Sequence, residues 1–238
     1  MTDRDLLFFL PGGGVGEEEM PLIRALVEAD NRFRMVSFPG WRRYVSREFS
    51  AEGVLADIVA LIDAKVSKDR IWLAGLSLGA HFGYAAAVRL QQKGRDIAGF
   101  CAIDGLMNGY PVRQAFQLLR ERQFRHLWEL SRAKARHSVI RLRGHRHSGS
   151  QHTQLSSLVL WLAAARTWTL SLDIDPIPLM AANALVRTRP GAADDEVWKR
   201  RCPGLRIFTV PGTHQTMFDP NNVTAFRQAF TAAMQSWP

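Results

Sequence analysis

The sequence predicts an α/β protein with a mostly parallel sheet and helices on both faces. Two observations predict this fold class and its organisation as one domain. Short apolar runs that resemble buried strands alternate with longer runs whose apolar residues recur at helical spacing. The 238 residues also contain no internal repeat, and no Pro-, Gly- or Ser-rich linker separates off a second unit. We therefore expect one large domain over residues 1–238.

The alternation is regular up to residue 105. Strands are predicted at 6–10, 33–38, 71–74 and 97–103, and helices at 17–29, 51–66 and 78–92. From 106 to 172 the pattern becomes helical and irregular, with aromatic residues among basic ones. It resumes with an apolar stretch at 177–186, a short helix at 194–201, a strand at 205–210 and a closing helix at 223–234. Residues 106–172 are thus predicted to be an insertion between strands of one sheet.

Composition excludes several classes of protein. With 47% hydrophobic and 22% charged residues, the chain is not a disordered protein. No apolar run reaches the roughly 18–20 residues of a membrane-spanning helix, and 6–10 is too short for a signal peptide. We expect a cytoplasmic protein. Cys101 and Cys202 lack metal-ligand spacing, and a reducing compartment disfavours a disulfide between them. Neither a metal nor a tightly bound cofactor is expected.

The net charge of +9 is concentrated in one segment. Residues 113–147 hold ten Lys or Arg and two Asp or Glu, which gives +8. One interpretation is a solvated helical face. The other is a docking surface whose field attracts an acidic partner. The sequence alone leaves both open.

The strongest chemical signal is Gly75-Leu76-Ser77-Leu78-Gly79, which matches G-x-S-x-G. It follows a predicted strand and precedes a predicted helix, as the nucleophile elbow of the α/β-hydrolase fold requires. In that elbow the serine lies on a tight, strained turn that projects its hydroxyl from the sheet. Small residues are needed on either side because strand and helix approach closely there. Ser77 is therefore the predicted nucleophile.

A serine hydroxyl needs a base, and the chain order Ser, Asp, His of this fold points to His214. His214 follows the last predicted strand. Of the other six histidines, His81 lies in the elbow helix, and the rest lie in the predicted insertion: His126, His137, His145, His147 and His152.

Asp104 is the predicted acid, because it ends a strand and would emerge at the same sheet edge as Ser77. A capping role is the alternative for Asp104. Asp194 and Asp195 compete with it, since they also precede His214.

Two backbone amides are predicted to form an oxyanion hole. Leu78 directly follows the nucleophile, and Gly13 lies in the glycine-rich run after the first strand, which this fold uses for the second donor. The same run lacks the G-x-x-x-x-G-K-[ST] and G-x-G-x-x-G patterns of phosphate-binding loops.

Together these residues resemble the thioesterase domains of nonribosomal peptide and polyketide synthesis. The resemblance lies in GLSLGAHFGYAAAVRLQQKGRDIAGFCAIDG over Gly75–Gly105, in FLPGGG near the start, in Phe38-Pro39-Gly40 and in VPGTHQTMF near the end. The family's pattern is the elbow, an Ala-rich helix, a Gly turn and an apolar strand ending in Asp. The resemblance leaves out most of the insertion.

The resemblance implies a substrate and a partner. The substrate would be an acyl or peptidyl chain held as a thioester on the phosphopantetheine of a carrier protein. Such carriers are generally acidic, which would give the basic segment 113–147 a partner, and residues 106–172 would be the family's helical lid. The family's acid stands where Asp104 does, 27 residues after the serine.

Some features depart from the family's pattern. Ala80 stands where glycine is frequent, and the insertion is unusually basic. Stand-alone editing thioesterases usually take their acid from a position near Asp194, whereas the acid predicted here is Asp104. A free-standing enzyme and an excised domain both stay open. The sequence does not indicate an oligomeric state.

Three functions are compatible with these features. The first is a thioesterase that releases its product by hydrolysis or cyclisation through acyl-Ser77. The second is a general carboxylesterase or lipase with the same triad and no carrier partner. The third is a non-enzymatic basic protein that binds nucleic acid through 113–147, which the complete set of triad residues disfavours.

Overall fold

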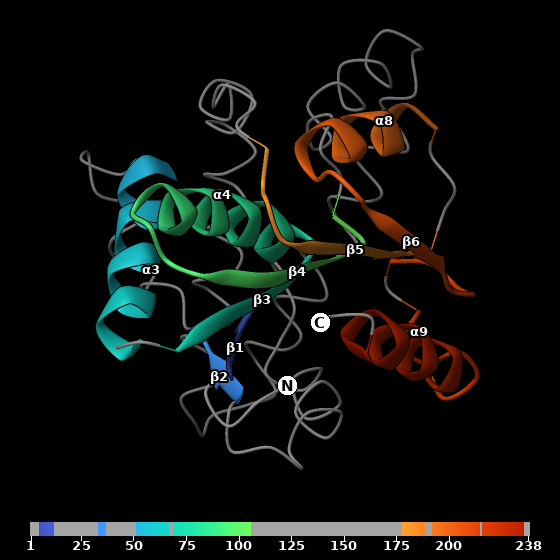
Figure 1. The fold of residues 1–238 in the computed structure, drawn as a ribbon. Coiled ribbons are helices and arrows are strands. Elements are labelled where there is room, and N and C mark those ends of the chain that lie inside the picture. Colours follow the sequence, from blue (N-terminus) through green and yellow to red (C-terminus); the bar gives the residue numbers. More distant parts are fainter. Residues whose placement is uncertain are drawn as a thin grey trace, which may run out of the picture.

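The computed structural model describes residues 5–11, 33–36, 51–66, 69–105, 178–188, 192–214 and 216–235. In these residues six strands form one sheet in the order β2-β1-β3-β4-β5-β6, and every neighbouring pair is parallel (Figure 1). The predicted mostly parallel sheet is therefore confirmed. Because all six strands run the same way, their carboxyl ends meet along one edge.

The elements follow one another as strands and helices in alternation. The strands are β1 (Asp5–Leu10), β2 (Phe33–Met35), β3 (Arg70–Leu76), β4 (Ile97–Ile103), β5 (Ala182–Arg187) and β6 (Arg206–Thr209). The helices are α3 (Ala51–Lys65), α4 (Leu78–Gln92), α8 (Ala192–Arg201) and α9 (Val223–Gln235).

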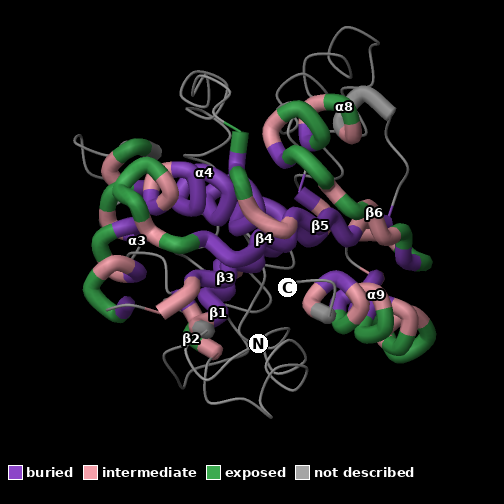
Figure 2. The backbone as a smooth tube through the Cα atoms, viewed as in Figure 1, coloured by how far each residue is buried: buried purple, intermediate pink, exposed green. Residues whose placement is uncertain are grey.

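Helices cover both faces of the sheet, and a hydrophobic core lies on each. On one face α3, α4 and α8 pack against strand residues such as Phe100. On the other face α9 packs its Phe226 and Phe230 against residues such as Trp72. Figure 2 shows β3, β4 and most of α4 as buried. A strand covered on both faces needs apolar residues at every position, which explains the unbroken apolar runs at 71–74 and 97–103.

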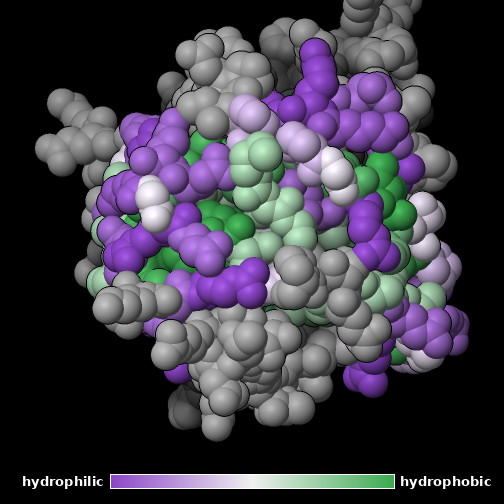
Figure 3. Space-filling model, viewed as in Figure 1, coloured by the Kyte–Doolittle hydropathy of each residue, from purple (hydrophilic) through white to green (hydrophobic). Residues whose placement is uncertain are grey.

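The outer faces of the helices are polar. In Figure 3 hydrophilic residues cover much of this side of the described molecule, with apolar residues visible between them. Asp63 of α3 accepts hydrogen bonds from Lys93 at 3.2 Å and Arg95 at 2.7 Å, both just after α4. These contacts connect the two helices across the surface of the protein.

Most predicted element bounds agree with the structure within one or two residues, and those of α4 and β4 agree fully. The stretch 177–186 is an exception, because the strand begins only at Ala182. Before it, the backbone N–H of Leu179 donates to Arg201 at the end of α8, and that of Met180 donates to the Gln91 side chain. These amides thus bond to helices instead of a neighbouring strand. The predicted helix 17–29 and the predicted lid insertion 106–172 lie outside the described residues.

Three further features bear on the sequence predictions. No helix in the described part of the chain is long and apolar enough to cross a membrane. Cys101 and Cys202 are buried free thiols, and burial raises the pKa of Cys202 to about 12. Within the described ranges, no three His, Cys, Asp or Glu side chains cluster as metal ligands would.

Candidate active site

Ser77 lies on the sharp turn between β3 and α4. Its backbone angles are φ 54° and ψ −116°, and it is 2% exposed. A positive φ is strained for a residue with a side chain, and such strain is typical of functional turns. The predicted nucleophile therefore has the backbone conformation that an elbow requires.

The glycines of the elbow allow three pieces of backbone to meet. A Cβ on Gly75 would lie 2.1 Å from the carbonyl oxygen of Gly79. A Cβ on Gly79 would lie 2.2 Å from the carbonyl oxygen of Leu10, at the end of β1. Any larger residue would push the strand, the helix and the segment after β1 apart. This close packing explains the small residues of the G-x-S-x-G pattern.

Ser77 and Asp104 leave the sheet side by side. Leu76 pairs with Ile103 in the register of β3 and β4, and the N–H of Ser77 donates to the carbonyl of Ile103 at 2.8 Å. The N–H of Asp104 in turn donates to Val186 of β5 at 2.7 Å. Asp104 also has a positive φ of 45°. Both predicted residues are thus fixed by backbone hydrogen bonds to the neighbouring strand.

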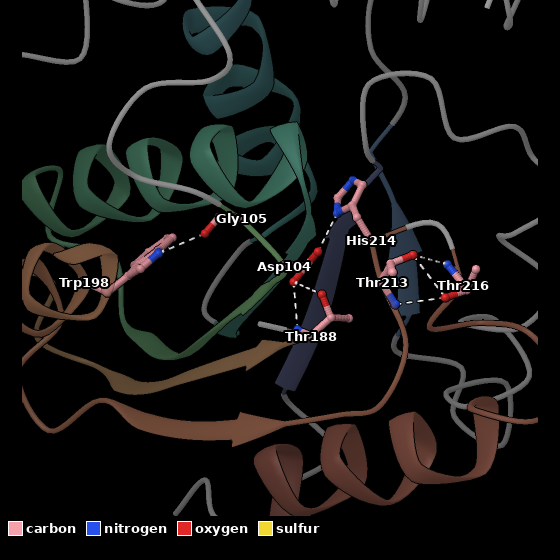
Figure 4. A network of polar contacts seen from close by, with 7 residues as sticks. All are labelled: Asp104, Gly105, Thr188, Trp198, Thr213, His214 and Thr216. Carbon is pink, nitrogen blue, oxygen red and sulfur yellow. Dashed lines mark hydrogen bonds and ion pairs between the residues drawn. The ribbon is translucent and has the colours of Figure 1, made fainter. Parts of the chain in front are cut away.

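The structure brings Asp104 and His214 together. Nδ1 of His214 lies 2.6 Å from Oδ2 of Asp104 (Figure 4). The other carboxylate oxygen, Oδ1, accepts hydrogen bonds from Thr188, one from its backbone N–H at 2.9 Å and one from its hydroxyl at 3.0 Å. This geometry fixes one imidazole nitrogen on the carboxylate and leaves Nε2 for another group.

The electrostatics of the pair favour an ionised carboxylate. Burial is the largest influence on Asp104 and raises its pKa, but the hydrogen bonds from His214 and Thr188 together hold the pKa below its usual value. The side chain of Asp104 is 14% exposed and that of His214 is 31% exposed. The acid is therefore enclosed, whereas the imidazole is open to an incoming group.

Local hydrogen bonds hold the loop that carries His214 after β6. The N–H of Thr213 donates to the hydroxyl of Thr216 at 2.9 Å, and Thr216 and Met217 donate their N–H groups to the carbonyl of Thr213 at 3.0 and 2.9 Å. Asn222 donates to the carbonyl of Thr216 at 2.9 Å. These bonds hold the described backbone on both sides of His214.

Two of the competing residues, Asp195 and His81, have other surroundings in the described structure. Asp195 of α8 forms an ion pair with Arg187 at the end of β5. The side chain of Asp194 lies outside the described residues. His81 is buried in α4, and burial, aided by the charge of Arg201, lowers its pKa to about 3. The remaining histidines lie outside the described residues.

Of the two residues predicted to donate to an oxyanion, Leu78 lies in the described structure and Gly13 does not. Leu78 begins α4, and the first amides of a helix have no partner within the helix. Gly13 lies outside the described residues. The chain leading to it passes the elbow, because the carbonyls of Leu10 and Pro11 face Gly79.

Sequence reasoning missed two residues of the site. Thr188 bonds Asp104, and the indole Nε1 of Trp198 donates to the carbonyl of Gly105 at 3.0 Å. Thr188 directly follows β5, so its place at the carboxyl edge of the sheet was a usable signal. Trp198 gave no such signal, since an apolar residue in a short helix resembles ordinary core.

Comparison with known proteins identifies the fold. No family model matches the sequence, and neither does any curated protein. The solved structures that match include the NocB thioesterase domain, in covalent complex with a fluorophosphonate nocardicin G analog. That match has a TM-score of 0.67 and 17% identity, over 97% of this chain and 94% of that one.

Two other thioesterases match similarly. The Vlm2 thioesterase domain, bound with a dodecadepsipeptide, has a TM-score of 0.65 and 19% identity over 97% of this chain and 93% of that one. YbtT, the type II thioesterase from the yersiniabactin NRPS/PKS pathway, has a TM-score of 0.61 and 18% identity over 99% of this chain and 93% of that one. At such identities the likeness shows the fold, which is the predicted α/β-hydrolase fold.

Proposed function

We infer that this protein is a serine thioesterase that releases an acyl or peptidyl chain from the phosphopantetheine thioester of a carrier protein. The observation that carries the proposal is the elbow at Ser77 together with the hydrogen bond between Asp104 and His214 at the same sheet edge. The shared fold with NocB, Vlm2 and YbtT supports a thioester over other acyl substrates.

In the first half of the proposed reaction, Ser77 is acylated. Asp104 holds Nδ1–H of His214, so Nε2 accepts the Ser77 proton as Oγ attacks the thioester carbonyl carbon. The carbonyl oxygen becomes an oxyanion, which the N–H groups of Leu78 and Gly13 stabilise. When the intermediate collapses, the carbon–sulfur bond breaks, and His214 returns the proton to the departing thiolate. The acyl group then remains as an ester on Ser77.

In the second half the ester is cleaved. Water, or a nucleophilic group within the same acyl chain, attacks the ester carbonyl while His214 accepts its proton. The oxyanion forms in the same place, and its collapse returns the proton to Ser77 Oγ. Hydrolysis gives a free acid, and internal attack gives a ring. No cofactor enters either half of the reaction.

The proposed partner is an acidic acyl or peptidyl carrier protein. The charge of +8 over residues 113–147 supports this partner, because oppositely charged surfaces accelerate encounter. These residues lie outside the described structure, and so does the lid that residues 106–172 are proposed to form.

The test compares two substrates made from the same acid. One is the acyl chain on a phosphopantetheinylated carrier, and the other is a simple alkyl ester. Intact-protein mass spectrometry follows acylation of the chain and its return to the free form. We expect loading and turnover with the carrier thioester, a slower reaction with the ester, and neither with Ser77→Ala. Faster turnover of the ester would favour the carboxylesterase alternative.

A further inference from the structure

Trp198 connects α8 to the turn that carries the proposed acid. Its indole is fully buried, and Nε1–H donates to the carbonyl of Gly105 at 3.0 Å (Figure 4). Gly105 directly follows Asp104. A helix that begins 88 residues after Asp104 in the sequence thus bonds the backbone next to the acid.

The donor itself is held rigidly. The ring of Phe100 stacks on the indole at 6.0 Å and 28°, and that of Tyr84 meets it edge-on at 6.1 Å and 87°. The helix is also fixed to the sheet, because Asp195 forms its ion pair with Arg187 of β5. The indole N–H therefore has a defined position relative to β4 and β5.

The turn at Asp104 and Gly105, which Trp198 bonds, has a backbone conformation that neighbouring residues must stabilise. Asp104 has a φ of 45°, and a residue with a side chain keeps this conformation only where its surroundings impose it. On the side facing the elbow helix there is no spare room, since a Cβ on Gly105 would lie 2.5 Å from that of Ala80. The turn is therefore pressed against α4 and bonded to α8.

We propose that Trp198 is a positioning residue that acts on the reaction through the Gly105 carbonyl, by holding the Asp104 turn so that the carboxylate meets His214. The proposal rests on the function inferred above, in which Asp104 orients the base. Trp198 itself touches no substrate in this scheme. Its effect is on the length and direction of the Asp104–His214 hydrogen bond.

The test removes the indole N–H and keeps an aromatic ring. Trp198→Phe is compared with Trp72→Phe, a matched loss of a fully buried indole in the other core. The first readout is the proton NMR resonance of the His214 Nδ1–H, which a short hydrogen bond to a carboxylate moves far downfield. The second is the pair kcat and KM with a small soluble acyl thioester.

We expect Trp198→Phe to move the proton resonance upfield and to lower kcat by roughly 3- to 10-fold, the effect of one ordinary hydrogen bond. KM should stay constant, because the variant leaves substrate contacts intact. Trp72→Phe should change neither the resonance nor kcat.

Two results would overturn the proposal: an unshifted resonance with normal kcat in Trp198→Phe, or equal changes in Trp72→Phe. If Trp198→Phe fails to fold, benzothienylalanine at position 198 keeps the bicyclic shape and lacks only the donor, and the same expectations apply. The resonance is measured without substrate. A shifted resonance in a chain with no thioesterase activity would therefore support the positioning role and contradict the proposed function alone.

Discussion

His214 and Asp104 are 110 positions apart in the sequence, yet Nδ1 of one lies 2.6 Å from Oδ2 of the other. The parallel sheet explains this meeting. Asp104 directly follows β4, and His214 lies in the loop after β6. Thr188 directly follows β5, the strand between them, and bonds the same carboxylate. Three neighbouring strand ends thus build one polar network, and β3 adds Ser77 beside it.

Ser77→Ala should abolish turnover while preserving the fold, because the change removes one hydroxyl at the elbow. Loss of a triad serine typically lowers kcat by 10⁴-fold or more. A fluorophosphonate probe with mass-spectrometric mapping checks the assignment, and Ser77 should be the labelled serine. Normal turnover by the variant, or labelling of a different serine, would show that the nucleophile is misassigned.

Asp104→Asn should be far more damaging than a change at the competing acids. An amide cannot stabilise the imidazolium or hold the required tautomer, and comparable changes lower kcat about 10⁴-fold. Asp195→Asn loses an ion pair with Arg187, and its cost should appear in the unfolding free energy instead of kcat. Steady-state kinetics on Asp104→Asn, Asp194→Asn and Asp195→Asn would show which aspartate is the catalytic acid. An inactive Asp194→Asn beside an active Asp104→Asn would match the stand-alone editing enzymes.

Thr188→Val should affect both the pH dependence of stability and kcat. Bonds from Thr188 help to hold the pKa of Asp104 below its usual value, so ionised Asp104 stabilises the fold above about pH 4. That stability is lost as pH falls through the lowered pKa. Removing the hydroxyl raises the pKa, so acid unfolding should begin at a higher pH.

Thr188→Ser provides the control, because it keeps the hydroxyl that bonds Oδ1. Circular dichroism across an acid titration measures the pH at which half of the protein is unfolded. This midpoint should be higher in Thr188→Val than in the parent and in Thr188→Ser. We expect kcat to be roughly 3- to 10-fold lower in Thr188→Val than in the parent, and to equal that of the parent in Thr188→Ser. Equal midpoints for Val and Ser would mean that the backbone N–H of Thr188 alone fixes the carboxylate.

The sequence predicted the features that depend on local pattern. The strand, G-x-S-x-G and helix around Ser77 are contiguous, so short-range signals were sufficient. Asp104 and His214 could be placed at one sheet edge from strand ends and chain order. The contacts of Thr188 and Trp198 with the acid turn could not be predicted, because they depend on register and on the packing of α8. The true start of β5 was also missed, since tertiary bonds from Leu179 and Met180 decide it.

His81→Gln should make the free energy of unfolding fall less steeply as the pH is lowered. Burial lowers the pKa of His81 from 6.5 to about 3, so the folded protein keeps it neutral where the unfolded chain binds a proton. Its neutral form is therefore fully compatible with folding above pH 6.5, and the free energy of unfolding falls as pH drops from there toward 3. One such proton contributes at most roughly 1.4 kcal/mol per pH unit.

Urea unfolding at pH 7.5, 6 and 5 measures the effect of this change. At pH 7.5 the difference in unfolding free energy between variant and parent reflects only the change in packing. This difference is the baseline for the differences at pH 6 and 5. Between pH 6 and 5 the unfolding free energy of the variant should fall less steeply than that of the parent. Parallel slopes would mean that His81 takes up its proton in the folded state as readily as in the unfolded chain.

We propose that the basic segment 113–147 docks an acidic carrier protein. Charge reversal to Glu at Arg132, Lys134, Arg136 and Arg141 should slow reaction with carrier-bound substrate. Reaction with a small soluble thioester should barely change, because the proposed triad is untouched. Exposed charges act mainly on encounter and are screened over about 8–10 Å at physiological salt. Raising salt should therefore bring the parent toward the rate of the variant on the carrier substrate.

A matched control reverses four exposed cations elsewhere, namely Lys199, Arg200, Arg206 and Arg227. The two variants have the same net charge, so a difference between them isolates the position of the charge. Equal loss of both activities in the segment variant would make 113–147 a structural part of the enzyme. Unchanged rates on both substrates would make its charge a solvated surface. A docking role requires that kcat/KM falls for the carrier substrate alone, and more than in the control.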